Sequence, residues 1–595
     1  MCGIAAIYSY QNKDIKINSQ ELVRVRDYMV SRGPDGSGLW IDKDQVIGLA
    51  HRRLAILDLS SAGAQPMHSL SGLYSIVFNG EIYNFKQLRE TLAEKGYIFF
   101  SGTDTEVLIN AYQEYGQDMV LHLQGMFAFA IWDHKKNGLF LARDHFGIKP
   151  LYYHDNGYIV RVASQVKSLV HGGGIYTQLE PAGQVGFLLW GFVPDPYTSY
   201  RGIFSLPAGH TLWVDQKGPS KANKYFDIAE EISTAESTQF NNDIEGVISE
   251  ALEHSVKQHL IADVPVGVFL SAGLDSSALL AIGAQKDKSL SAVTLGFDVF
   301  KRTAVDEVPL AKKIAEHFRC SHNYSYIDQR DFNEELPKIL HAMDQPSIDG
   351  INTYLVSRAA KNAGLKVCLS GVGGDELFGG YPSFEQIPKL TARMEVFSKV
   401  PMFGKCLRFI SSSILRRMML PKYAGIFEYG DSYSGAYLLR RGLFMPWELP
   451  SLLDADIVKE GWEKLQPLIR MNDLIRPLSG SHAKITTLEL SMYMRNMLLR
   501  DADWAGMAHS LEIRTPMVDI GLFRAIAPLL SQKGDYLNKK HLAGVLKRYL
   551  PQEVLDRPKS GFAIPVSSWL GGDENIKNSN GLRVWALKIQ TNGGS

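Results

Sequence analysis

Short runs of apolar residues alternate with polar turns along the first two hundred positions of the chain. The runs at 75–78, 126–132 and 138–142 have the length and composition of buried β-strands. Between them, residues 84–96 and 104–115 follow a helical pattern, and each segment starts with a residue type that caps helices. The pattern predicts a β-rich, layered domain.

A second pattern follows a polar stretch. Residues 183–215 read as the last strands of the first domain, and the turns and polar residues at 216–242 predict a linker. A helix is expected at 243–260. Residues 264–270 and 365–369 then read as buried strands, each followed by a loop of small and polar residues. A strand, a small polar loop and a helix in this order present backbone N–H groups to an anion.

Composition narrows the classes of function. A chain of 595 residues is expected to hold more than one domain. Its 45% hydrophobic and 21% charged residues are typical of a soluble globular protein. Lys+Arg and Asp+Glu both number 63 and no long basic block occurs, which disfavours a nucleic-acid partner. The apolar run at 185–193 is too short to span a bilayer and the N-terminus lacks a signal-peptide pattern, so no membrane partner is expected.

The cysteines are widely spaced and form no CxxC pair. They are Cys2, Cys320, Cys368 and Cys406. This spacing argues against a zinc site or a disulfide framework and predicts a cytoplasmic, reducing environment.

Cys2 is the first candidate for chemistry. Removal of Met1 is expected because the next side chain is small, and removal would leave Cys2 with a free α-amine. An α-amine has a pKa of roughly 7.7–8.0 and acts as a base near neutral pH. A thiol beside its own base is a nucleophile suited to acyl transfer. Position alone leaves chance as the alternative.

The loop at 271–277 is the second candidate. It lacks the GxxxxGK[ST] pattern, so it is not a Walker A loop. Acidic residues beside a phosphate loop indicate Mg²⁺, and Asp275 and Asp375 are the best candidates. Lys559 lies in a loop with Pro and Gly, from which it could reach a phosphate. The alternatives are an ordinary turn, a helix cap at Asp375 and a solvated lysine.

Several stretches of the first two hundred residues, taken together, resemble the class II glutamine amidotransferase domain. They are Cys2-Gly3-Ile4, Arg32-Gly33-Pro34-Asp35-Gly36, residues 51–58, Gln65-Pro66-Met67, Asn79-Gly80-Glu81-Ile82-Tyr83-Asn84, Gly125-Met126-Phe127-Ala128-Phe129 and residues 143–150. The resemblance implies an N-terminal-nucleophile hydrolase fold, an α+β sandwich with αββα layers.

The same resemblance implies the roles of single residues. Cys2 attacks the glutamine side-chain amide, giving a γ-glutamyl thioester and ammonia, and its amine shuttles the proton. The oxyanion needs preorganised donors, which would be the Asn79 side chain and the Gly80 backbone N–H. The sequence alone does not choose between Arg52 and Arg53 as the guanidinium for the substrate carboxylate; the resemblance selects Arg53. The implied glutamine-binding residues are Arg53, Leu54, Ala55, Ile56, Leu57, Asn79, Gly80 and, for the α-ammonium, Glu81 and Asp104.

The loop at 271–277 is similar to the pyrophosphate-binding loop of ATP pyrophosphatases, Ser-Gly-Gly-x-Asp-Ser-Ser, with Ala272 in place of one glycine. Together with the stretches at 370–381, 498–503, 507–516 and 557–565, it resembles the glutamine-hydrolysing asparagine synthetase family, over nearly the whole chain. The resemblance implies a glutamine amidotransferase domain at 1–215, a linker at 216–242 and, at 243–595, an α/β ATP-pyrophosphatase domain with a parallel sheet and a helical C-terminal part.

In that family a carboxylate attacks the α-phosphorus of ATP, and ammonia arriving through an internal tunnel then displaces AMP. The implied ATP-binding residues are Leu270, Ser271, Gly273, Asp275, Ser276, Ser277, Leu295, Ser370 and Gly371. Asp275 and Asp375 would hold Mg²⁺, and Lys559 would be catalytic by stabilising charge on the phosphates. The expected small-molecule partners are glutamine, ATP and a carboxylate acceptor.

Three positions depart from the family pattern. Val372 stands where asparagine-making members commonly carry Glu or Asp, Gln345 where Asp-Glu-Pro is common, and Gln165 where many members have Glu. Aspartate is the first candidate for the acceptor. The alternative acceptor is another carboxylate, such as a uronic-acid sugar of a surface-polysaccharide pathway. A third interpretation is a regulatory homologue that carries out no synthesis. The sequence leaves the oligomeric state open, with a homodimer among the options.

Overall fold

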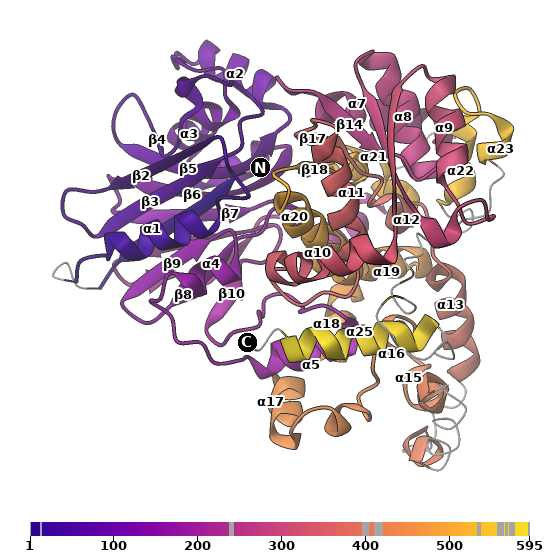
Figure 1. The fold of residues 1–595 in the computed structure, drawn as a ribbon. Helices are drawn as coiled ribbons and strands as arrows, with labels where there is room; N and C mark the ends of the chain where they lie inside the picture. The colour runs from indigo at the N-terminus through magenta and orange to yellow at the C-terminus, as the bar shows by residue number, and fades with distance from the viewer. Residues whose placement is uncertain are drawn as a thin grey trace.

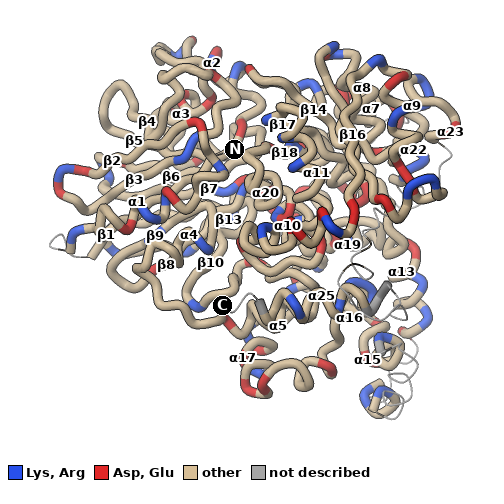
Figure 2. The backbone as a smooth tube through the Cα atoms, viewed as in Figure 1, with Lys and Arg blue, Asp and Glu red and all other residues tan. Residues whose placement is uncertain are grey.

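The computed structural model describes residues 2–11, 15–236, 243–395, 404–409, 421–531, 537–555, 565, 569 and 578–592, with backbone alone at 421, 578–580 and 592. Two antiparallel sheets lie in the N-terminal half, and a parallel sheet surrounded by helices lies in the other half (Figure 1). Within these ranges, no helix combines the length and apolar character needed to cross a bilayer. Basic and acidic positions interleave in both halves (Figure 2).

The N-terminal half is an αββα sandwich, as the resemblance to the glutamine amidotransferase domain implied. In spatial order, its first sheet consists of β10 (Ile203–Ser205), β8 (Tyr152–Asp155), β9 (Ile159–Ala163), β1 (Gly3–Ser9), β3 (Ile47–Arg53) and β2 (Gly36–Ile41). The second consists of β12 (Gly218–Pro219), β11 (His210–Asp215), β7 (Gly138–Arg143), β6 (Gly125–Asp133), β5 (Tyr74–Ile82) and β4 (Met67–His68), and β13 (Asn223–Lys224) pairs with β11. The outer helices are α1 (Ser19–Tyr28) and α4 (Val166–His171) on the first sheet, and α2 (Phe85–Glu94) and α3 (Asp104–Tyr115) on the second.

The alternation of side chains along β1 explains the layers. Ile4 and Ala6 pack between the two sheets, whereas Ala5 and Ile7 pack under α1. Successive side chains of a strand point to opposite faces, so a strand that is apolar on both faces needs a covering layer on each side.

Two expectations for the middle of the chain need correction. Pro181–Trp190 form a helix, α5, within the segment predicted to be strands. An uninterrupted apolar run does not distinguish a buried strand from a buried helix; the helix signals are Pro181 at the first position and the left-handed Gly191 at the end. The expected linker also has structure, because it contains β12, β13 and α6 (Ile228–Ala235). The domain boundaries themselves stay predictions.

The C-terminal half contains the predicted parallel sheet. Its spatial order is β16 (Ser321–Ile327), β15 (Ser291–Phe297), β14 (Val266–Phe269), β17 (Val367–Leu369) and β18 (Glu512–Arg514). The chain winds outward from β14 to β16 and then returns to the other side of β14, so the winding direction reverses between β14 and β17. Such a switch point opens a crevice at the carboxyl ends of the strands.

Helices surround this sheet and make up most of the described C-terminal part. They are α7 (Ile244–His259), α8 (Leu274–Lys286), α9 (Val308–His317), α10 (Gln329–Ala342), α11 (Ile351–Asn362), α12 (Gly374–Leu377), α13 (Ser383–Met394), α15 (Ile426–Tyr429), α16 (Tyr433–Arg441), α17 (Ala455–Leu465), α18 (Pro467–Ile475), α19 (Ser481–Leu488), the π-helix η7 (Glu489–Leu499), α20 (Arg500–Met507), α21 (Ile520–Ser531), α22 (Lys539–Leu546), α23 (Gln552–Leu555) and α25 (Asn578–Asn592).

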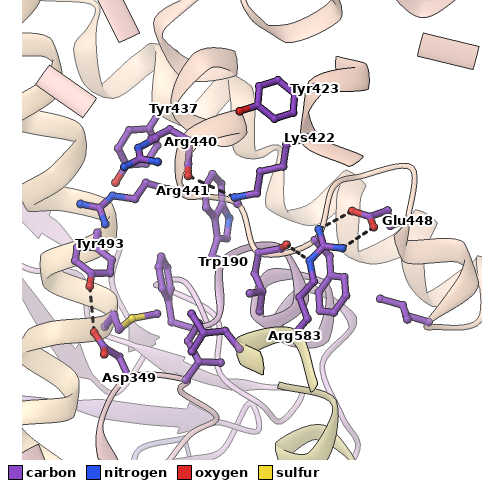
Figure 3. Close-up of a pocket in the computed structure, with 18 of the residues that line it drawn as sticks. Trp190, Asp349, Lys422, Tyr423, Tyr437, Arg440, Arg441, Glu448, Tyr493 and Arg583 are labelled. Atoms are coloured by element: carbon purple, nitrogen blue, oxygen red, sulfur yellow. Dashed lines mark hydrogen bonds and ion pairs between the residues drawn. The ribbon is translucent and has the colours of Figure 1, made fainter. Parts of the chain in front are cut away.

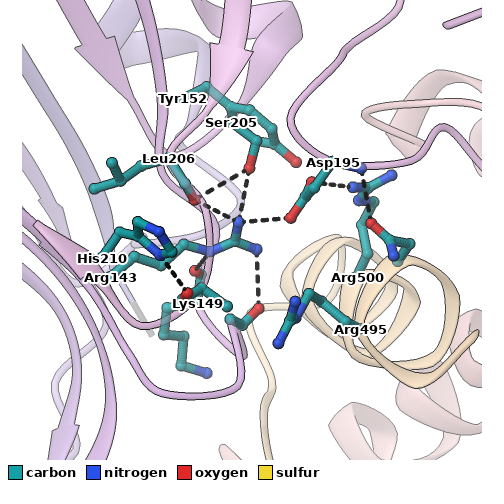
Figure 4. A network of polar contacts seen from close by, with 12 residues as sticks. Arg143, Lys149, Tyr152, Asp195, Ser205, Leu206, His210, Arg495 and Arg500 are labelled. Carbon is teal, nitrogen blue, oxygen red and sulfur yellow. Dashed lines mark hydrogen bonds and ion pairs between the residues drawn. The ribbon is translucent and has the colours of Figure 1, made fainter. Parts of the chain in front are cut away.

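Buried ion pairs join the two halves. Arg32, which is fully buried, donates to both carboxylate oxygens of Asp503, at 2.6 and 3.0 Å. Arg143 of β7 and Arg500 of α20 share the carboxylate of Asp195, at 3.0 and 2.8 Å (Figure 4). Removing one partner of such a pair leaves a buried charge unpaired, which is strongly destabilising. These pairs therefore fix how the sandwich sits on the parallel sheet.

Candidate functional site

Cys2 lies at the start of β1, where the first sheet meets β5 of the second. Its backbone N–H donates to the Oδ1 of Asn79 at 2.9 Å, and its carbonyl accepts from the Nε of Arg32 at 3.1 Å. Burial raises the pKa of the Cys2 thiol, while nearby positive charges and the Leu54 backbone N–H act to lower it. The thiol is thus held in a site where added positive charge would favour the thiolate.

Asn79 and Gly80 supply the features of an oxyanion site. The Asn79 side chain is fully buried, and its Nδ2 has no hydrogen-bond partner among the described residues. A buried donor without a partner is costly unless a ligand uses it. Gly80 has a φ of +153°, and a Cβ there would lie 2.0 Å from the Met126 carbonyl oxygen, so only glycine fits.

The structure separates the two adjacent arginines. Arg52 pairs with Asp27 of α1 at 2.5 Å, away from the thiol. The guanidinium of Arg53 donates to the backbone carbonyls of Ser60, at 2.7 Å, and of Asp58, and its charge acts on the Cys2 thiol. This placement favours Arg53 as the guanidinium of the site. The predicted neighbours Leu54, Ala55 and Ile56 are buried, and Leu57 is partly buried.

Glu81 and Asp104 bring two buried carboxyl groups to the same region. Asp104, at the start of α3, accepts from the Ile82 N–H at 3.0 Å, and burial raises its pKa to about 7. Burial also raises the pKa of Glu81, against the pull of Arg514, whose guanidinium lies 3.3 Å from the Glu81 carboxylate. Arg514 ends β18 of the parallel sheet. No pattern in the sequence indicates this contact between the two halves.

The crevice at the switch point is a cavity of about 710 Å³. Most residues predicted to bind ATP or metal line it, namely Leu270, Ser271, Gly273, Asp275, Ser276, Leu295, Ser370, Gly371 and Asp375. Ser277 does not line it; the side chain is buried and its Oγ has no hydrogen-bond partner among the described residues. The cavity has the size of a site for a drug-sized or nucleotide-sized ligand.

The loop after β14 is folded on itself. The Ser276 hydroxyl accepts from the Ser271 N–H at 3.2 Å and donates to the Gly273 carbonyl at 3.1 Å. Ala272 has a φ of +53°, a conformation that glycine adopts far more readily than alanine. Alanine at this position therefore adopts the left-handed conformation in which the family pattern has glycine.

Lys539, at the start of α22, is a cavity residue that the sequence analysis missed. Its Nζ contacts the Asp275 carboxylate and lies 3.1 Å from Asp375. Burial lowers the pKa of Lys539, but the two carboxylates outweigh burial and raise it. In the sequence, Lys539 and Lys540 follow Asn538 in a polar stretch typical of a protein surface. Nothing in that stretch indicates that Lys539 contacts Asp275 and Asp375.

The two carboxylates fit a hard divalent cation. A Cβ at Gly374 would lie 2.5 Å from the Asp275 carboxyl, and one at Gly380 would lie 2.0 Å from Asp375, so these glycines leave room around both groups. The Lys539 ammonium contacts both carboxylates in this structure. Within the described ranges no group of three His, Cys, Asp or Glu could hold an ion. Phosphate oxygens would have to complete the ligand set, as is usual for Mg²⁺.

The positions that depart from the family pattern lie in different places. Val372 lines the nucleotide cavity. Gln345 is buried and spans the two halves, donating to the Tyr152 hydroxyl at 3.1 Å and accepting from the Ser199 N–H at 3.2 Å. Gln165 caps α4. Only Val372 is thus in contact with the space where the acceptor would react. The predicted catalytic Lys559 lies outside the described residues.

The fold combines a sandwich that holds a buried cysteine beside Asn79 with a parallel-sheet half whose crevice has the size of a nucleotide site. Comparisons with known proteins give the family. The glutamine amidotransferase domain family matches residues 1–226, and the asparagine synthase family matches residues 247–579. The chain is 32% identical to glutamine-hydrolysing asparagine synthetase 1 of Bacillus subtilis, over 97% of this chain and 89% of that protein.

Two other relatives show the range of names in the family. A putative glutamine-hydrolysing asparagine synthetase of Mycobacterium bovis is 32% identical, over 93% of this chain and 86% of that protein. Amidase chry2 of Gibberella zeae is 27% identical, over 97% of this chain and 91% of that protein. The chain belongs to the glutamine-hydrolysing asparagine synthetase family, whose members are glutamine-dependent amidotransferases that use glutamine and ATP.

Proposed function

We propose that the chain converts a carboxylate into an amide, with ammonia that Cys2 releases from glutamine and with cleavage of ATP to AMP and pyrophosphate. The unpartnered, buried amide donor of Asn79 beside Cys2 supports this proposal most, since it is placed to bind an oxyanion. Removal of Met1 would turn the Cys2 nitrogen into a primary amine that keeps its contact with Asn79.

In the glutaminase reaction, the Cys2 sulfur bonds to the side-chain amide carbon of glutamine. The carbonyl oxygen becomes an oxyanion held by Asn79 Nδ2 and the Gly80 N–H, and the Cys2 amine passes the thiol proton to the nitrogen. The C–N bond breaks and ammonia leaves; water then hydrolyses the thioester to glutamate. Arg53 would hold the substrate α-carboxylate, and Glu81 and Asp104 its α-ammonium.

In the synthetase reaction, an oxygen of the acceptor carboxylate bonds to the α-phosphorus of ATP and pyrophosphate leaves. Ammonia then bonds to the acyl carbon, and AMP and a proton leave. The loop at 271–277 would hold the pyrophosphate by its N–H groups and the start of α8. Mg²⁺ held by Asp275 and Asp375 would supply charge neutralisation for the phosphates. Lys539 would then pair with phosphate oxygens in place of the two carboxylates.

Aspartate is the acceptor that the names of the relatives favour. Val372 in the cavity wall favours a second candidate, a different carboxylate, because valine cannot act as the acid or base that a carboxylate at this position would be. Glu376 also lines the cavity, and burial raises its pKa to about 7. A base of this pKa could take up the proton released from ammonia without a carboxylate at 372.

The test is a turnover assay with glutamine, ATP and Mg²⁺. We expect equal amounts of glutamate, AMP and pyrophosphate to appear once an accepted carboxylate is added. Aspartate and uronic acids are compared by identifying the amide formed. Release of no AMP with any of these acids, with glutamate still formed, would exclude the proposed synthesis.

A further inference from the structure

A second cavity, of about 770 Å³, adjoins the nucleotide cavity. Its walls come from α5, α16, α25 and the short helix η5 (Pro421–Gly425). Asp349 and Tyr493 line both cavities, and the Tyr493 hydroxyl donates to the Asp349 carboxylate at 3.0 Å (Figure 3). A single pair of side chains thus stands where the two cavities meet.

Cations outnumber carboxylates on the wall of this second cavity. The cations are Lys422, Arg440, Arg441 and Arg583, and the carboxylates are Asp349 and Glu448. Arg583 is already bound to Glu448 through two N–H groups, at 2.9 and 3.0 Å, and Arg441 pairs with Glu489 at 2.8 Å. Lys422 and Arg440 form no ion pair with any carboxylate of the described residues. They are free to bind an anion.

Positive charge prevails around Lys422. Its Nζ lies 3.5 Å from the backbone carbonyl oxygen of Arg440. Burial lowers the pKa of Lys422 to about 8, and the charges of Arg583, Arg440 and Arg441 add to the effect of burial, whereas the Glu448 carboxylate opposes it. Like charges gathered around a partly buried lysine are stabilised by an anionic ligand.

Aromatic side chains also line this cavity. Trp190 is 3% exposed, and its ring centroid lies 6.3 Å from that of Phe192 and 6.2 Å from that of Tyr437. At the end shared with the nucleotide cavity, the Arg441 guanidinium lies 3.9 Å from the Tyr493 ring centroid. Figure 3 shows Trp190 between the Asp349–Tyr493 end and the Arg583–Glu448 end. Aromatic side chains in a pocket bind flat or ring-shaped ligand parts.

On the basis of the proposed function, we infer that the acceptor is a ring-bearing carboxylic acid with a second, phosphate-type anionic group, as in a nucleoside-diphosphate uronic acid. The ring would pack near Trp190 and the phosphate-type group would bind Lys422 and Arg440. The carboxylate would pass the Asp349–Tyr493 pair and meet the α-phosphorus of ATP. Free aspartate is too small to use both ends of this space.

Equilibrium binding tests this assignment without turnover. UDP-glucuronic acid is titrated calorimetrically into the full-length protein and into the Lys422→Met/Arg440→Met double variant, which keeps most of the side-chain bulk. We expect binding to the double variant to be weaker by at least about tenfold, because hydrogen bonds to charged groups are each worth about that factor. ATP affinity should stay within about twofold. Lys459→Met, an exposed position on α17, is the matched control and should bind as the wild type.

Three outcomes would overturn the inference: no binding of UDP-glucuronic acid, equal affinity of wild type and double variant, or loss of binding only when ATP is added, which would place the probe in the nucleotide cavity.

Turnover with free ammonia separates failure of this inference from failure of the proposed function. Asparagine formed from aspartate, with kcat/KM unchanged in the double variant, would overturn the larger acceptor and leave the amide synthesis standing. Probe binding that the double variant loses, without AMP formation from any acid, would support the binding site and exclude the synthesis.

Discussion

The two sites of this chain are prepared for their ligands in different ways. At the cysteine centre, β1 and β5 bring the Cys2 N–H and Asn79 Oδ1 together at 2.9 Å, and the buried Asn79 amide donor has no partner among the described residues. At the nucleotide cavity, the carboxylates that would hold a cation are instead bound to Lys539. The first site only needs to receive its ligand. At the second site, the ion pair between Lys539 and the two carboxylates must be replaced by contacts with the ligand. A substitution that removes one of these charges should therefore change ligand binding at the second site and leave the first site unaffected.

Cys2→Ala gives the largest expected effect and separates the two sites. Glutamine-dependent synthesis should fall by at least about 10³-fold, because the proposed nucleophile is gone. Synthesis from free ammonia should remain within about twofold of the wild type, since the nucleotide cavity is intact. Glutamate release and ammonia-dependent pyrophosphate release are the two readouts. If both disappeared, the model of two sites linked only by ammonia would be wrong.

Asn79→Ala tests the preorganised donor. Loss of one oxyanion donor typically lowers kcat by about 10²–10³-fold, and we expect that loss in glutamate release. KM for glutamine should change less, because the donor acts on charge that develops during the reaction. Asn362→Ala, at an exposed position on α11, is the control. A change in KM alone would mean that Asn79 binds glutamine and does not stabilise its oxyanion.

Lys539→Met tests the exchange at the other site. Without the ammonium, Asp275 and Asp375 repel each other and the phosphates lose a counter-charge, so ammonia-dependent pyrophosphate release should fall by about 10²-fold. Basal glutaminase activity should not change. Lys547→Met, exposed just after α22, serves as the control. An unchanged rate would show that Lys539 is a structural partner of the two carboxylates and has no part in the reaction.

Sequence reasoning reached much of both sites but not the contacts that join them. Short apolar runs indicate the strands β5, β6 and β7, and small, polar residues indicate the loop after β14. Their positions could therefore be predicted from the sequence. Lys539 and Arg514 could not be assigned, because their partners lie far away in the sequence and only the packed fold brings them together. The helix α5 was misread as strand because an apolar run lacks a distinguishing period.

The smallest expected effect is the change with pH in kcat/KM for glutamate release, which tests the buried carboxyl group of Asp104 at the cysteine centre. Burial raises the pKa of Asp104 to about 7, so this group is ionised above that pH and neutral below it. A neutral Asp104 cannot pair with the substrate ammonium; kcat/KM for glutamate release should therefore fall as the pH drops below about 7, by close to tenfold per pH unit. Asp104→Asn should remove this limb and lower kcat/KM at pH 8, whereas Asp118→Asn, at an exposed position, should keep the wild-type profile. A flat wild-type profile between pH 6 and 8 would contradict the role given to Asp104.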